Sequence, residues 1–127
     1  MTTILLVEED PLAAQPTLSL LGSRFGEVRR VADAAAALCA IEEPDFAAKL
    51  SLVISAHLTR GIGGPVFVAE LCERMPGLPV LVLGAPGASA ADYRGSHIEF
   101  LPAHSEPEKM VTLVGQLLAR ENGSTTR

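Results

Sequence analysis

Three consecutive acidic residues, Glu8, Glu9 and Asp10, stand near the amino terminus of this 127-residue chain. They directly follow the apolar run 3–7, and such a run ended by charged residues is typical of a central strand in a parallel sheet. Carboxylates at a strand end lie where ligands of open parallel sheets bind. The acidic run is therefore the one clear cluster of functional-looking charge in the chain, although a solvated loop without a ligand also explains it.

The other positions where chemistry is possible follow later apolar runs, because ligands of open parallel sheets bind beyond the carboxyl ends of the strands. His57 stands in the segment 55–64, and the segments 84–87 and 102–105 come after two further runs. His57 as a phosphorylated residue or a metal ligand is an open alternative, but we expect it on a solvated loop. The glycines in 61–64 lack a following Lys-Ser/Thr, so turn geometry explains them better than phosphate binding.

The elements that would position these residues alternate along the chain. The apolar pattern predicts strands over 3–7, 27–31, 50–55, 78–83 and 98–101, and helices over 11–21, 32–43, 66–75 and 106–121. Gly22 is expected to end the first helix, and Pro16 to kink it. The segment 85–97 contains Pro86, Gly87 and Gly95, which predicts a short or irregular fourth helix.

Five strand–helix units with short connections predict one α/β domain with a doubly wound parallel sheet. We assign it to residues 1–121, followed by a polar tail, 122–127. The segment 44–50 is interpreted as a small insertion before the third strand. Cys39 and Cys72 lie in apolar helical stretches, which predicts buried small side chains rather than a disulfide or a metal pair.

The composition limits the function. The chain is 48% hydrophobic and 20% charged, with a net charge of −5 and scattered basic residues, which disfavours direct nucleic-acid binding. The amino terminus lacks the basic and apolar segments of a signal peptide, and no apolar stretch reaches the length of a membrane span. We therefore expect a cytoplasmic protein without membrane contacts.

In order and spacing, the sequence resembles the receiver domain of bacterial two-component response regulators, the CheY-like family, over residues 3–120. The resemblance rests on the segments 4–7 with the acidic pair, 31–34, 52–55, Gly64, 78–83 and 100–101. It implies the flavodoxin/CheY-like (βα)5 fold with strand order 2-1-3-4-5. It also implies a phosphorylation switch: an acidic pair that holds Mg²⁺, an aspartate that accepts the phosphoryl group, a Ser or Thr, and a Lys.

Transferred to this sequence position by position, that switch is incomplete. Glu8 and Glu9 match the acidic pair, with Glu9 where Asp is usual, so the resemblance implies at most a weak Mg²⁺ site at these two residues. Ala56 stands at the phosphoacceptor position, Gly84 at the hydroxyl position and Ala103 at the lysine position, and an alanine methyl group cannot form an acyl phosphate.

Two neighbours of these positions also bear on the switch. His104 replaces the proline that usually follows the lysine. Phe100 matches the aromatic residue that follows the switch hydroxyl, and without that hydroxyl its ring is expected to rest inward.

We therefore predict a pseudo-receiver: a non-enzymatic signalling domain that acts by protein–protein interaction without phosphorylation. Its expected partners are a histidine kinase or an effector protein, with a homodimer through the helices of segments 85–97 and 106–121 as a further possibility. On this view the acidic run could also be a fixed negative charge that imitates an occupied switch. Two alternatives stay open: a receiver phosphorylated at an unconventional residue near the vacated position, such as Ser55, His57, Thr59 or Asp10, and a small-ligand sensor that uses the emptied pocket at Ala56, Gly84 and Ala103.

Overall fold

The computed structural model describes residues 2–58, 61–93, 95 and 97–125, with only the backbone described for 121–125. Its strands are β1 (Thr3–Val7), β2 (Glu27–Val31), β3 (Leu50–Ala56), β4 (Val80–Leu83) and β5 (Ile98–Leu101). They form one parallel sheet in the order β2-β1-β3-β4-β5. The predicted fold class and strand order are confirmed, and the strand bounds differ from prediction by at most two residues.

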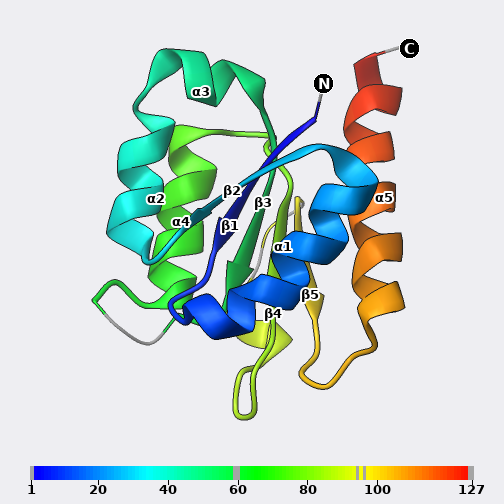
Figure 1. Ribbon diagram of the computed structural model, residues 1–127. Coiled ribbons are helices and arrows are strands. Elements are labelled where there is room, and N and C mark those ends of the chain that lie inside the picture. Colours follow the sequence, from blue (N-terminus) through cyan, green and yellow to red (C-terminus); the bar gives the residue numbers. More distant parts are fainter. Residues whose placement is uncertain (1, 59–60, 94, 96, 126–127) are drawn as a thin grey trace.

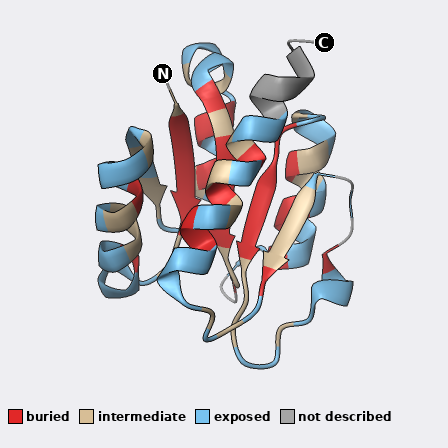
Figure 2. Cartoon of the chain, turned by 90° about the vertical axis from the view of Figure 1, so that its right-hand side faces the viewer, coloured by how far each residue is buried: buried red, intermediate tan, exposed pale blue. Residues whose placement is uncertain are grey.

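Helices cover both faces of this sheet (Figure 1). On one face, α1 (Pro11–Phe25) and α5 (Pro107–Thr125) pack on alternate strand residues such as Ile4, Leu52 and Leu81. On the other face, α2 (Ala34–Ile41) and α4 (Gly64–Arg74) pack on residues between these, such as Leu5 and Val53. Figure 2 shows the central strands buried along their length, as continuous apolar runs require.

The predicted end of α1 at Gly22 is wrong, because the helix continues to Phe25. Gly22 keeps a helical backbone, which costs a glycine only about 1 kcal/mol relative to alanine and does not break a helix. The helix ends at Gly26, whose φ of 116° lies in the left-handed region that glycine adopts without a steric penalty. Pro16 lies inside the helix without ending it.

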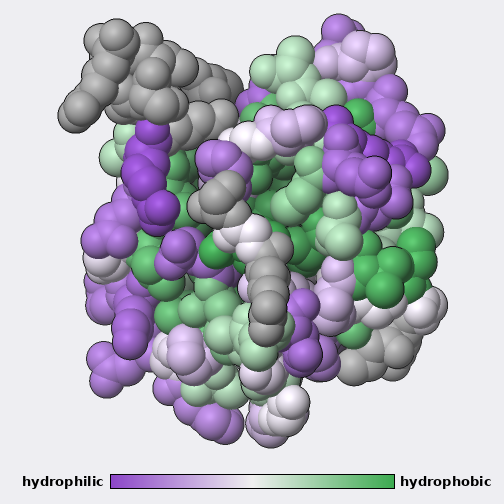
Figure 3. Space-filling view, turned by 180° about the vertical axis from the view of Figure 1, so that it is seen from behind, coloured by the Kyte–Doolittle hydropathy of each residue, from purple (hydrophilic) through white to green (hydrophobic). Residues whose placement is uncertain are grey.

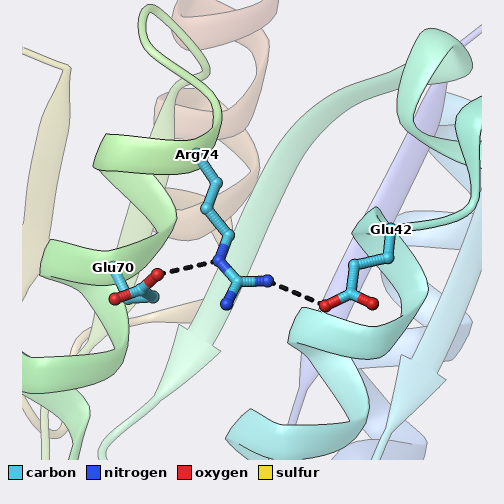
Figure 4. A network of polar contacts seen from close by, with 3 residues as sticks. All are labelled: Glu42, Glu70 and Arg74. Atoms are coloured by element: carbon cyan, nitrogen blue, oxygen red, sulfur yellow. Dashed lines mark hydrogen bonds and ion pairs between the residues drawn. The ribbon is translucent and has the colours of Figure 1, made fainter.

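The predicted helix over 32–43 is shorter, spanning α2 alone with Asp33 as its amino-terminal cap. The expected insertion forms a helix of its own, α3 (Pro44–Lys49), which begins at a proline, a residue that suits the first helical turn. Arg74 at the end of α4 donates hydrogen bonds to Glu70 on the same helix and to Glu42 after α2 (Figure 4). All three side chains are substantially exposed, so this network contributes modestly to stability.

Between β4 and β5 the only described helical element is the 3-10 turn η1 (Ala90–Asp92). The expectation of a short fourth helix is confirmed, since Pro86 and Gly87 interrupt the segment. Figure 3 shows hydrophobic residues exposed between α4 and α5 on this side, where a longer helix would lie.

The last helix was predicted too short: α5 runs through Thr125, so most of the expected tail has a helical backbone, and 126–127 lie outside the described residues. Asn and Gly lower helix propensity but do not end a helix as proline does. The expected burial of both cysteines is also wrong. Cys39 is exposed and Cys72 is half-buried, with its thiol pKa raised by burial, and both are free. No described helix is long and apolar enough to span a membrane.

Candidate functional site

The described residues that the receiver resemblance singled out lie at the carboxyl edge of the sheet. Val7 at the end of β1 pairs with Ser55, which pairs with Val82 on β4. Leu83, the residue before Gly84, pairs with Ala56 and with Leu101. The edge therefore places the acidic run after β1, His57 after β3, Gly84 after β4 and Ala103 after β5 in neighbouring loops, as predicted.

The acidic run is used within its own loop. Asp10 is the amino-terminal cap of α1, where its Oδ1 accepts a hydrogen bond from the Leu12 N–H at 2.9 Å. Glu8 Oε2 accepts a hydrogen bond from the Asp10 N–H at 3.1 Å. Glu9 is half-buried. Two of the three acidic residues thus satisfy backbone donors at the beginning of a helix, where negative charge is also favourable.

A guanidinium group from β2 holds the backbone of this loop. Arg30 donates from Nη2 to the carbonyl oxygens of Glu8 and Glu9, at 2.8 and 3.4 Å, and from Nε to the Glu8 carbonyl at 3.2 Å. The sequence did not reveal this role, because Arg30 stands in the chain beside Arg29 as an ordinary basic pair. A fixed cation therefore lies against the acidic run.

Few side-chain oxygens of the described residues converge on the acidic run, and the weak Mg²⁺ site at Glu8 and Glu9 stays a prediction. Octahedral Mg²⁺ needs several converging oxygen ligands, and Ala56 supplies no side-chain oxygen. Among the described residues, no group of three or more His, Cys, Asp or Glu side chains is placed to hold a metal ion. One oxygen each of Glu8 and Asp10 is already bound to a backbone N–H.

His57 does not lie on a solvated loop as expected. It is half-buried, and its Nδ1 lies 3.1 Å from the hydroxyl of Tyr93, which is only 7% exposed. Burial, together with the negative charge of Asp92, raises the pKa of Tyr93 above its ordinary value. Ser55 is buried as expected, and its hydroxyl donates to the Ala56 carbonyl at 2.9 Å. Thr59 lies outside the described residues.

Tyr93 reaches this position because Gly64 has no side chain. A Cβ atom on Gly64 would collide with the Tyr93 hydroxyl group. The Tyr93 ring lies 5.9 Å from the Phe100 ring, centroid to centroid, in a tilted arrangement. No sequence pattern marks Tyr93, because its role depends on a contact with a residue 36 positions away.

The space beside Gly84 is occupied. A Cβ atom there would lie 2.8 Å from Phe100 Cζ, 3.0 Å from the Leu101 carbonyl oxygen and 3.1 Å from the Ala103 nitrogen. The Gly84 N–H donates to that same carbonyl at 2.7 Å. The Phe100 ring rests inward, as expected, and it lies where a side chain at position 84 would begin.

A pocket of about 240 Å³ opens on the other side of Gly84, between α1 and the beginning of α5. Gly84, Ala103 and His104 line it. Glu8, Glu9, Asp10, Ala56 and His57 are not among its lining residues. A pocket common to all these residues stays a prediction, and beside Gly84 the Phe100 ring lies in contact with Tyr93.

Comparison with known proteins identifies the fold. No protein-family model matches the sequence, and no curated protein matches it. The chain is similar to the signal receiver domain of an HD domain-containing protein from Pseudomonas fluorescens Pf-5, with a TM-score of 0.84 and 22% identity over 99% of this chain and 93% of that one.

Two further solved structures are similar. A response regulator receiver domain protein from Clostridium thermocellum has a TM-score of 0.84 and 17% identity, over 96% of this chain and 98% of that one. The receiver domain of the hybrid histidine kinase CckA has a TM-score of 0.73 and 25% identity, over 91% and 98%. The chain therefore has the fold of a response regulator receiver domain.

Proposed function

We propose that this chain is a receiver-like signalling domain of two-component type that works without phosphorylation and without enzymatic activity of its own, through contacts with other proteins. The observation that carries the proposal is the occupied space at Gly84. The Phe100 ring and the backbone after β5 fill the position where a switch hydroxyl would attach. Ala56 offers no carboxylate to a phosphoryl donor, and Ala103 no cation to the transferred group.

The surroundings of these positions support one fixed conformation. The His57–Tyr93 hydrogen bond joins the loop after β3 to the connection between β4 and β5. The Tyr93–Phe100 ring contact continues that link into β5. Arg30 supplies positive charge to the acidic loop without a metal ion. A domain built in this way presents a constant surface to its partner.

The surface proposed for partner contacts runs from η1 across β5 to α5. Hydrophobic residues are exposed there between α4 and α5 (Figure 3), and β5 is an edge strand with a partly exposed outer side. Exposed apolar area of this kind marks interaction sites on soluble domains. A histidine kinase, an effector protein or a second copy of the chain would contact this side, and the proposed location is the cytoplasm.

The proposal is tested by incubating the purified chain with acetyl phosphate and Mg²⁺ and measuring the intact mass at neutral pH. We expect no phosphoryl adduct, while an ordinary receiver domain in the same reaction acquires one. The His57→Ala variant is measured in parallel. A stoichiometric adduct on the wild-type chain would overturn the proposal, and its loss in His57→Ala would assign the phosphoryl group to that imidazole.

A further inference from the structure

The pocket beside Gly84 is separate from the filled region around Tyr93. Its walls come from α1, from the ends of β4 and β5, and from the loop that leads into α5. The small residues Gly84 and Ala103 leave it open on the sheet side. The surroundings of Gly84 thus differ on its two sides. Phe100 packs against it on one side, and the pocket that Gly84 and Ala103 line lies on the other.

The walls of the pocket are apolar and stiff. Leu20, Leu83, Leu101 and Met110 line it, and the last two are 6% exposed. Three prolines also line the pocket, one inside α1 and two in the loop before and at the beginning of α5. Because proline fixes φ, the backbone around the opening is restricted and the pocket is largely preformed. A preformed pocket binds a ligand at a lower cost in ordering.

The polar residues of the lining indicate the charge of a ligand. They are Thr17, His104, Ser105 and Glu106, and the lining contains neither Lys nor Arg. His104 has a φ of 65°, the only positive φ among described non-glycine residues, and such outliers concentrate at functional sites. An anionic ligand would meet the Glu106 carboxylate with no lysine or arginine to hold it, whereas a hydroxyl or an amine would find acceptors.

We infer that this pocket binds a compact, mainly apolar small molecule, neutral or singly cationic, that carries one hydrogen-bonding group. At about 240 Å³ it lies below the range of about 300–1,000 Å³ that holds drug-sized ligands, so a compact ligand fits it better than a nucleotide does. The inference goes beyond the proposed function, since it adds a ligand site to a domain that otherwise acts through protein contacts.

The experiment uses three probes that differ mainly in charge: benzyl alcohol, benzylamine and benzoate. Each is titrated into the ¹⁵N-labelled chain, and amide chemical shifts are followed by NMR. We expect saturable shifts for the alcohol and the amine at Thr17, Leu20, Gly84, Ala103 and His104, with Kd on the order of 1 mM for ligands this small. Benzoate is expected to bind at least about tenfold more weakly because of Glu106.

Two variants fill the pocket from opposite walls, Ala103→Leu and Thr17→Leu, and each is expected to weaken benzyl alcohol binding at least about tenfold. Ala119→Leu, at an exposed position of α5 outside the pocket, is the matched control and should bind like the wild type. The native amide spectrum of each variant confirms its fold. Absence of saturable shifts, benzoate binding equal to that of the alcohol, or unchanged binding in both filled variants would overturn the inference. None of these results bears on the acetyl phosphate experiment.

Discussion

The two ends of the sheet's carboxyl edge differ from an ordinary receiver switch in opposite ways. At the β1–α1 end, the acidic residues that the receiver resemblance implies are present, and Asp10 caps α1 while Arg30 holds the backbone of their loop. At the β4–β5 end, Gly84 and Ala103 stand where a hydroxyl and a lysine would be expected, and the Phe100 ring lies against Gly84. Residue type and structural role are therefore separate questions, since the first end has the expected residues in a capping role and the second has aromatic packing in place of polar groups.

The largest effect is expected at Gly84. Gly84→Ala places a methyl group against Phe100 Cζ and two backbone atoms, so we expect it to lower the free energy of unfolding by about 1–3 kcal/mol, measured by urea denaturation. Gly22→Ala is the matched control. Nothing lies within 4 Å of its Cβ position, so it should stabilise α1 by about 0.5–1 kcal/mol. Equal effects of the two substitutions would show that the β4–β5 end is not tightly packed.

The second prediction concerns the cap of α1. Asp10→Ala removes the acceptor for the Leu12 N–H and should destabilise the fold by about 0.5–2 kcal/mol in the same denaturation experiment. Asp10→Asn keeps a capping oxygen and should recover most of that loss. If the acidic run served mainly as a cation site, the two variants would instead lose Mg²⁺-dependent stability to the same extent.

The His57–Tyr93 link is expected to contribute less. Tyr93→Phe removes the hydroxyl group but keeps the ring, which should cost about 0.5–1.5 kcal/mol. A double-mutant cycle with His57→Ala isolates the coupling between the two residues. A coupling energy near zero would show that the His57–Tyr93 hydrogen bond does not help to fix the conformation of these loops.

Tyr93 also predicts a pH dependence. Burial raises the pKa of Tyr93, so the folded state retains the phenolic proton more strongly than the unfolded chain does. The resulting stability is fully present below the unfolded value of about 10 and is lost as pH rises through the higher folded pKa. Raising the pH above about 10 should therefore lower the thermal stability of the wild type more steeply than that of Tyr93→Phe. Thermal denaturation of both proteins over this pH range measures the difference, and any contribution of Cys72 is common to both.

The smallest effect is expected away from both ends of the carboxyl edge, in the network of Arg74. Arg74→Gln should cost only about 0.2–1 kcal/mol, because the three side chains are exposed. The loss should shrink at about 1 M NaCl, where surface charges are screened. This variant provides the background level against which the effects at the carboxyl edge are judged.

How far the sequence predicts this molecule depends on the range of the interactions involved. The strands were predictable because short apolar runs such as 4–7 and 52–54 mark them. The end of α1 was not predictable, because either Gly22 or Gly26 could end the helix by residue type. Only Gly26 adopts a positive φ. At the site, the missing groups at Ala56, Gly84 and Ala103 were visible in the sequence.

The structural roles of Arg30 and Tyr93 at the site were not predictable. Arg30 and Tyr93 contact partners more than 20 positions away along the chain, and no local pattern marks either of them. The pocket likewise depends on how α1 and the beginning of α5 approach each other. Sequence motifs report which groups are absent, whereas packing decides what replaces them.

The ring of Phe100 has a consequence for redesign of the domain. A threonine at position 84 requires that ring to move, so a single substitution there is expected to give a less stable protein. Gly64 is restricted in a similar way, because a Cβ atom there meets the Tyr93 hydroxyl. Installing a hydroxyl at this edge of the sheet therefore requires coordinated substitutions of the glycine and of the ring that packs against it.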